Sequence, residues 1–77
     1  MTTTKTAAEL KTYRDQYVAT RASALAEARR CGDGASACAH AGRSGAAVWM
    51  RSESIALETA DRALVWIAEV DAMLAAL

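Results

Sequence analysis

Alanine supplies 20 of the 41 apolar residues in this 77-residue chain, and proline is absent. Alanine has the highest helix propensity of the common residues, and proline is the strongest helix breaker. Only 12 residues are leucine, isoleucine or valine, so the chain has little bulky side-chain volume with which to build a core. The sequence therefore predicts a single, predominantly α-helical domain over residues 1–77 that is poorly supplied with core.

The first helix is expected at about residues 7–31. Thr6 and Glu9 have the spacing of a capping box, in which the hydroxyl accepts from a backbone N–H of the first turn. Gly32 is a natural residue to follow the helix end. The apolar residues that recur at helical spacing are Leu10, Tyr13, Tyr17, Ala24 and Ala28, widened by Val18 and Leu25.

The last helix is expected at about residues 53–77, with Ser52 or Thr59 as its N-cap. At 100° per residue, its large apolar side chains fall on one arc, which Leu57 and Leu64 widen to about 200°. An arc that wide exceeds what one neighbouring helix covers, so the central segment or another chain must cover the rest. The remaining members of the arc are Ile55, Trp66, Ile67, Val70, Met73, Leu74 and Leu77.

The connecting segment, residues 32–51, contains all four glycines. Gly42 and Gly45 can form the turn of a short β-hairpin, with Val48, Trp49 and Met50 in its second strand. The competing interpretation is a glycine-rich loop, with the second helix starting near Ser44. The hairpin is favoured, which makes the fold α+β with two antiparallel helices; without it the chain is a helical hairpin.

Composition excludes several classes of protein. The longest fully apolar run is six residues, whereas a membrane span needs about 20. Residues 1–6 have no hydrophobic region of the kind found in a secretory signal. Net charge is zero, which provides no field for nucleic acid or an anionic membrane, and two cysteines are too few for a disulfide scaffold. A cytoplasmic protein is expected.

Cys31, Cys38 and His40 suggest a zinc site, but the spacing is not that of structural zinc ligands and the set is incomplete. A second interpretation is a Cys31–Cys38 disulfide across a loop. A third is that the two cysteines are small buried thiols. The third is favoured, so no metal and no other cofactor are expected.

No enzyme is predicted, and no small-molecule substrate. His40 lies near Ser36 and Ser44 in sequence, but a glycine-rich connector is a poor scaffold for a nucleophile–base pair. Nucleic-acid binding is not expected either, because the arginines that could touch phosphate lack accompanying aromatic residues. These arginines are Arg29, Arg30, Arg43 and Arg51.

The two ends of the sequence differ in charge. Residues 1–30 carry six basic and three acidic side chains, and residues 53–77 carry one basic and five acidic. Helices of opposite sign favour packing on each other or on those of a second copy. Arg14 and Arg21 interrupt the apolar stripe of the first helix. Either their stems cover apolar surface, or Arg14 pairs with Asp71, with which it is level in an antiparallel hairpin.

Four stretches resemble the small head–tail joining proteins of tailed bacteriophages, of the lambda protein W type. They are Ala8–Asp15 with Thr20–Ala24, Asp61–Asp71, and Met73–Leu77. The resemblance implies two helices flanking a β-hairpin, many copies in a ring, and contacts with portal and tail proteins. It also implies a location in the host cytoplasm and incorporation in the virion.

The alternative function is a homodimer, in which two hairpins form a four-helix bundle that acts as a regulator or inhibitor. In both cases the mechanism is recognition between proteins. Trp66 is expected to be a buried packing anchor, and Leu57 and Leu64 an uncovered flank. The complete set of expected interface residues is Arg14, Arg21, Trp49, Leu57, Leu64, Trp66 and Ile67.

Overall fold

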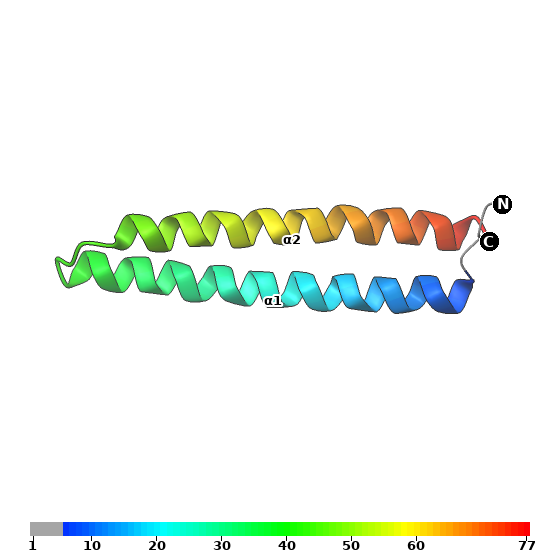
Figure 1. Cartoon of the computed structure of the whole chain (residues 1–77), viewed down its shortest axis with the longest axis horizontal. Helices are drawn as coiled ribbons and strands as arrows, with labels where there is room; N and C mark the ends of the chain where they lie inside the picture. The colour runs from blue at the N-terminus through cyan, green and yellow to red at the C-terminus, as the bar shows by residue number, and fades with distance from the viewer. Residues whose placement is uncertain (1–5) are drawn as a thin grey trace.

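The computed structural model describes residues 6–77, and over these residues the chain is a hairpin of two antiparallel helices without a strand (Figure 1). Helix α1 spans Ala7–His40 and helix α2 spans Ala46–Ala75. The hairpin measures 58 × 18 × 16 Å. The start of α1 and the end of α2 lie at one end, called here the open end, and the connection forms the tip (Figure 1). Met1–Lys5, part of the segment without secretory-signal character, lies outside the described residues.

Helix α1 begins where the sequence predicts. The Thr6 hydroxyl accepts a hydrogen bond from the Glu9 backbone N–H at 3.2 Å, and Thr6 has the extended backbone of an N-cap residue. The Leu10 N–H then bonds the Thr6 carbonyl at 3.0 Å, which closes the first helical turn.

The predicted end of this helix at residue 31 is wrong, because α1 continues through Gly32 and Gly34 to His40. Helix termination occurs instead at Gly42, whose φ of 66° only glycine adopts without strain. The Arg43 N–H bonds the Cys38 carbonyl at 2.9 Å and the Gly42 N–H bonds the Ala39 carbonyl at 3.2 Å, which is a Schellman motif. A glycine can remain inside a helix where nothing terminates it, and here the terminator lies ten residues later.

The β-hairpin prediction is also wrong. Residues 35–40 form the last turns of α1 and residues 46–51 the first turns of α2, which begins at Ala46 after Gly45 rather than at 53. Neither Ser52 nor Thr59 caps α2; Thr59 lies within it and donates its hydroxyl to the Ile55 carbonyl. The physical reason is the alanine content of both arms, which favours helix over strand.

The two helices meet along a seam with alternating spacings of three and four residues, the heptad pattern of a coiled coil. Every residue of the two series is buried or half-buried, and five of the nine fully buried residues are alanine. The largest side chain with almost no exposure is Cys31. In α1 the series is Leu10, Arg14, Tyr17, Arg21, Ala24, Ala28, Cys31, Ala35 and Cys38; in α2 it is Trp49, Glu53, Ala56, Ala60, Ala63, Ile67, Val70 and Leu74.

The seam of α2 is built on smaller side chains than the sequence predicted. The buried line runs through Ala56, Ala60 and Ala63, near the middle of the predicted 200° arc, whereas Trp66 lies toward one edge of that arc. Trp66 is 39% exposed, so it is not the buried anchor that the sequence predicted. Small side chains let the helix backbones approach, and the large ones are then displaced to the flanks of the contact.

Candidate protein-interaction surface

The hairpin has two broad faces, one on each side of the seam. Heptad positions are lettered a to g, and the seam residues occupy positions a and d. In an antiparallel pair, the e positions, each of which directly follows a d residue, lie together on one side of the seam. The g positions, each of which directly precedes an a residue, lie on the other side. Five of the e positions carry large apolar side chains, and we call this row the leucine face: Val18 and Leu25 from α1, and Met50, Leu57 and Leu64 from α2. The remaining e positions are Lys11, Gly32, Ala39 and Asp71. The g positions include Thr20, Glu27, Ser52, Thr59 and Trp66, and their side is called the groove face.

The leucine face is a row of apolar side chains along the middle of both helices. Two contacts fix the register between the helices: Arg14 bonds Asp71 near the open end, and Trp49 lies against Gly34 near the tip. This register places Val18 level with Leu64, Leu25 level with Leu57, and Met50 beside Gly32. All five residues of the row are exposed.

An ion pair lies at the open end of the leucine face. The Arg14 Nε donates to Asp71 Oδ1 at 2.6 Å, which confirms the pairing that the sequence offered as one of two alternatives. The hydrogen bond and the charge of Asp71 raise the pKa of Arg14 above its ordinary value. Arg21, the other arginine of the stripe, is half-buried on the seam between Val18 and Leu25.

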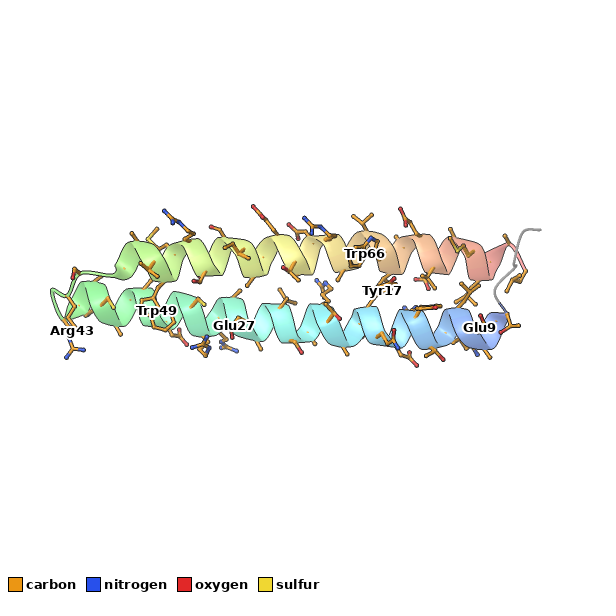
Figure 2. All side chains as sticks on the ribbon, in the orientation of Figure 1. Glu9, Tyr17, Glu27, Arg43, Trp49 and Trp66 are labelled. Atoms are coloured by element: carbon orange, nitrogen blue, oxygen red, sulfur yellow. The ribbon has the colours of Figure 1, made fainter. Side chains whose placement is uncertain are left out.

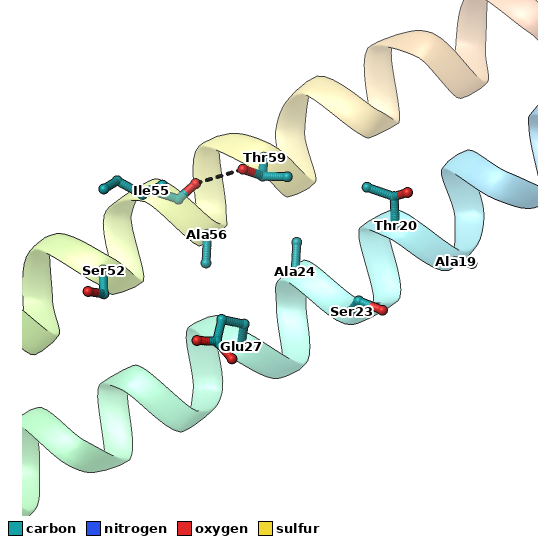
Figure 3. Close-up of a pocket in the computed structure, with 9 residues that line it drawn as sticks. All are labelled: Ala19, Thr20, Ser23, Ala24, Glu27, Ser52, Ile55, Ala56 and Thr59. Atoms are coloured by element: carbon teal, nitrogen blue, oxygen red, sulfur yellow. Dashed lines mark hydrogen bonds between the residues drawn. The ribbon is translucent and has the colours of Figure 1, made fainter.

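The groove face carries a shallow groove of about 760 Å³ near the middle of the hairpin (Figure 3). Ala24 and Ala56 face each other across it, and their small side chains are the reason for the gap. The Thr59 hydroxyl donates a hydrogen bond to the Ile55 carbonyl at 3.0 Å. The complete lining is Ala19, Thr20, Ser23, Ala24, Glu27, Ser52, Ile55, Ala56 and Thr59.

The carboxylate of this groove is already paired. Arg30 donates to both carboxylate oxygens of Glu27, from Nε at 3.0 Å and from Nη2, and its guanidinium lies 5.6 Å from the centre of the Trp49 ring. The hydrogen bond from Arg30 lowers the pKa of Glu27. A carboxylate with a lowered pKa is a weak proton acceptor, so Glu27 is poorly suited to activate the hydroxyls of Ser23 or Ser52.

Trp66 contributes to the groove face toward the open end. Its ring lies 5.1 Å from that of Tyr17, at an interplanar angle of 43°, and the two point toward each other across the helices (Figure 2). A second, smaller pocket beside this pair is lined by Tyr13, Tyr17, Trp66, Glu69, Val70 and Met73. The aromatic pair therefore links the helices at the edge of the seam.

The residues of the considered zinc site are not brought together. Cys31 is buried in the seam, Cys38 lies seven residues further along the same helix, and the exposed His40 places its Nδ1 3.1 Å from the Ser36 carbonyl. Seven residues of helix rise about 10.5 Å, which also excludes the Cys31–Cys38 disulfide. Residues 6–77 contain no cluster of three or more potential metal ligands. Neither of the two helices in this range has an apolar stretch long enough to cross a bilayer.

The predicted interface residues separate into three places. Leu57 and Leu64 lie on the leucine face, Trp66 lies on the groove face, and Ile67 is buried in the seam. Arg14, Arg21 and Trp49 are half-buried seam positions. The exposed residues of this face that the sequence reasoning did not include are Val18, Leu25 and Met50. The heptad spacing of the small residues, which places all three beside the seam, is the signal that could have found them.

Comparison with known proteins gives no guide to function: no protein family, curated protein or solved structure matches this chain.

Proposed function

We propose that the protein is a non-enzymatic interaction protein that works as a homodimer, with the leucine faces of two hairpins packed into a four-helix bundle. The observation that carries the proposal is the placement of the large apolar side chains. Among residues 6–77 nine are buried, of which only Leu10, Ile67 and Val70 exceed cysteine in size, while twelve large apolar residues are exposed. A contiguous apolar strip on a small domain is characteristic of an association surface.

The exposed area of the chain supports the same proposal. The hairpin exposes 5773 Å², whereas a folded monomer of 8.1 kDa is expected to expose about 4,500 Å². The excess reflects a rod of two helices that buries only one stripe of each. Packing a second layer of helices on the leucine face buries Val18, Leu25, Leu57 and Leu64 and supplies the core that the alanine seam lacks.

The experiment is size-exclusion chromatography with light scattering on the wild-type chain and two matched variants. Leu64→Glu changes the leucine face, and Ile55→Glu changes a residue of similar exposure, 58% against 49%, on the groove face. We expect a mass of twice 8.1 kDa for the wild type at micromolar concentration. Burying a leucine contributes about 1.5–3 kcal/mol and each substitution occurs twice, so Leu64→Glu should raise the dimer Kd by about 100-fold or more. Ile55→Glu should change it by less than about threefold.

Two results would contradict the homodimer: a wild-type monomer at about 100 µM, or equal weakening by the two variants. Circular dichroism of Leu64→Glu serves as the control for folding. Retained helicity assigns the loss to association, and loss of helicity assigns Leu64 to the core of a single chain.

The second candidate is the head–tail joining role, which the resemblance of Ala8–Asp15 and Asp61–Asp71 supports. In that role the leucine face packs on neighbouring subunits of a ring beneath a phage portal, in the host cytoplasm and then in the virion. Hairpin edges cannot take part among residues 6–77, because these contain no strand. A marginally stable monomer in the light-scattering experiment favours this role over the homodimer, and binding to isolated portal or tail proteins tests it.

A further inference from the structure

We infer that the occupant of the leucine face is a second copy oriented with its tip at the same end, so that each α1 lies over the α2 of the other copy. This inference rests on the proposed self-association and adds its geometry. Two hairpins can pack these faces symmetrically in two ways. A two-fold axis along the hairpin pairs α1 with α2 and keeps the tips together; an axis across it pairs α1 with α1 and places the tips at opposite ends.

Helix charge favours the first arrangement. Helix α1 carries five basic and four acidic side chains, a net charge of +1, and α2 carries two basic and five acidic, a net charge of −3. Pairing α1 with α2 brings opposite signs together twice in the dimer. The crossed arrangement pairs α2 with α2 along its whole length, and like charges facing each other across an interface are unfavourable.

Individual charges at the borders of the face agree with this choice. Lys11 is the e residue of α1 level with Asp71, so with the tips together it faces the Asp71 of the other copy. Near the tip, Arg29 borders the face one turn from Gly32, over which the Glu53 carboxylate lies. With the tips together, Arg29 of one copy is brought to Glu53 of the other. With the tips apart, Lys11 faces Ala39 and Arg29 faces Ala22.

The apolar layers match in the same arrangement. Val18 faces Leu64 of the second copy, Leu25 faces Leu57, and the long Met50 side chain faces the small Gly32. The face measures about 58 by 18 Å, an outline of about 1,000 Å² per copy. A stable interface needs about 800 Å² per partner, so one leucine face is large enough for the purpose.

The test is a distance between spin labels at the tip, measured by pulsed electron paramagnetic resonance on the full chain. Ser44→Cys carries the label in a Cys31→Ala, Cys38→Ala background, since alanine already occupies the neighbouring seam positions Ala28 and Ala35. Helix layers pack about 10 Å apart, so tips at the same end should give a label separation of roughly 15–30 Å. Tips at opposite ends should give a separation near the 58 Å length of the hairpin.

A label at Ala75, at the open end, is the matched control and should also give a short distance. Long distances at both sites overturn the orientation while the light-scattering mass leaves the homodimer intact; a monomeric mass for the wild-type chain overturns both. If the labelled background does not dimerise, isotope-filtered nuclear Overhauser spectra of a mixed dimer of the unmodified chain decide the question. Contacts between Val18 and Leu64 of different copies support the orientation, and contacts between Val18 and Gly32 overturn it.

Discussion

The two faces of the hairpin flank the same alanine seam but differ in what the sequence places there. On the leucine face, five e positions carry large apolar residues, Val18 and Leu25 in α1 and Met50, Leu57 and Leu64 in α2. On the groove face, hydroxyl residues and a paired carboxylate alternate with a few large side chains, and the small alanines between them leave an open groove. The first face thus carries a row of large apolar side chains with charged residues at its open end, and on the second face polar and apolar side chains alternate.

The seam holds the helices together with side chains that are small enough for close approach, and the bulky side chains lie exposed on its flanks. In the homodimer that we propose, the seam and the leucine face therefore have separate tasks. A core of large residues at the seam would stabilise the single hairpin but leave less apolar surface for association. The following predictions test whether the two faces differ in this way.

The largest effect is expected from exchanging residues 57 and 59, which lie on opposite sides of the seam. The double variant Leu57→Thr, Thr59→Leu keeps the composition but moves a leucine from the leucine face to the groove face. Because the loss occurs twice in a symmetric dimer, its Kd should rise about 100-fold. Analytical ultracentrifugation measures it, with Thr59→Leu alone as the control. Unchanged association of the exchanged variant would mean that the two faces are equivalent.

Trp66→Ala should destabilise the hairpin by about 2 kcal/mol. A fully buried aromatic residue would cost about 3–5 kcal/mol, and the ring of Trp66 is partly exposed beside Tyr17. Urea denaturation in a Leu64→Glu background measures folding without association. A loss above about 4 kcal/mol would place Trp66 in the core after all. An unchanged midpoint would show that the contact between Trp66 and Tyr17 does not stabilise the folded hairpin.

Alanine substitutions at two helical glycines should have opposite signs. A Cβ at Gly34, on the groove face, would lie 2.7 Å from Cδ2 of the Trp49 ring, so overpacking exceeds the gain in helix propensity and Gly34→Ala should lose about 1 kcal/mol. A Cβ at Gly32, on the leucine face, meets only the end of the flexible Glu53 side chain. Gly32→Ala should therefore gain about 0.5–1 kcal/mol. Thermal melts of both variants in the Leu64→Glu background check the signs. Equal signs would show that the Trp49 ring is not fixed against Gly34.

The smallest effect concerns the ion pair of the groove face. Arg30 lowers the pKa of Glu27 in the folded chain below its ordinary value of 4.5, so the stabilisation is present above that pH and is lost as the pH falls through the lowered value. Melting temperatures of the wild type and Glu27→Gln should therefore converge as the pH is lowered from neutral through the lowered pKa of Glu27. A difference that is independent of pH would show that the pair contributes through packing rather than charge.

Much of the fold could be predicted from the sequence, because the information is local. Alanine content and the absence of proline determine the helices, the Thr6 cap determines where α1 begins, and antiparallel packing places Arg14 level with Asp71. The helix limits near the connection could not be predicted in this way. Four glycines lie there, and only the bonds from Gly42 and Arg43 back to α1 distinguish the residue that ends the helix from those that continue it.

The candidate surface could be predicted only in part, for a related reason. A helical wheel ranks each side chain by its hydrophobicity, which selects Leu57, Leu64 and Trp66 as apolar and gives Trp66 as the expected anchor. The tertiary structure places the seam on the small residues Ala56, Ala60 and Ala63 within that arc, because close approach of two backbones depends on the size of the facing side chains in both helices. The sequence by itself determined that two amphipathic helices form and which residues are available to them. Only the packing of one helix on the other decided which apolar residues are enclosed and which remain exposed.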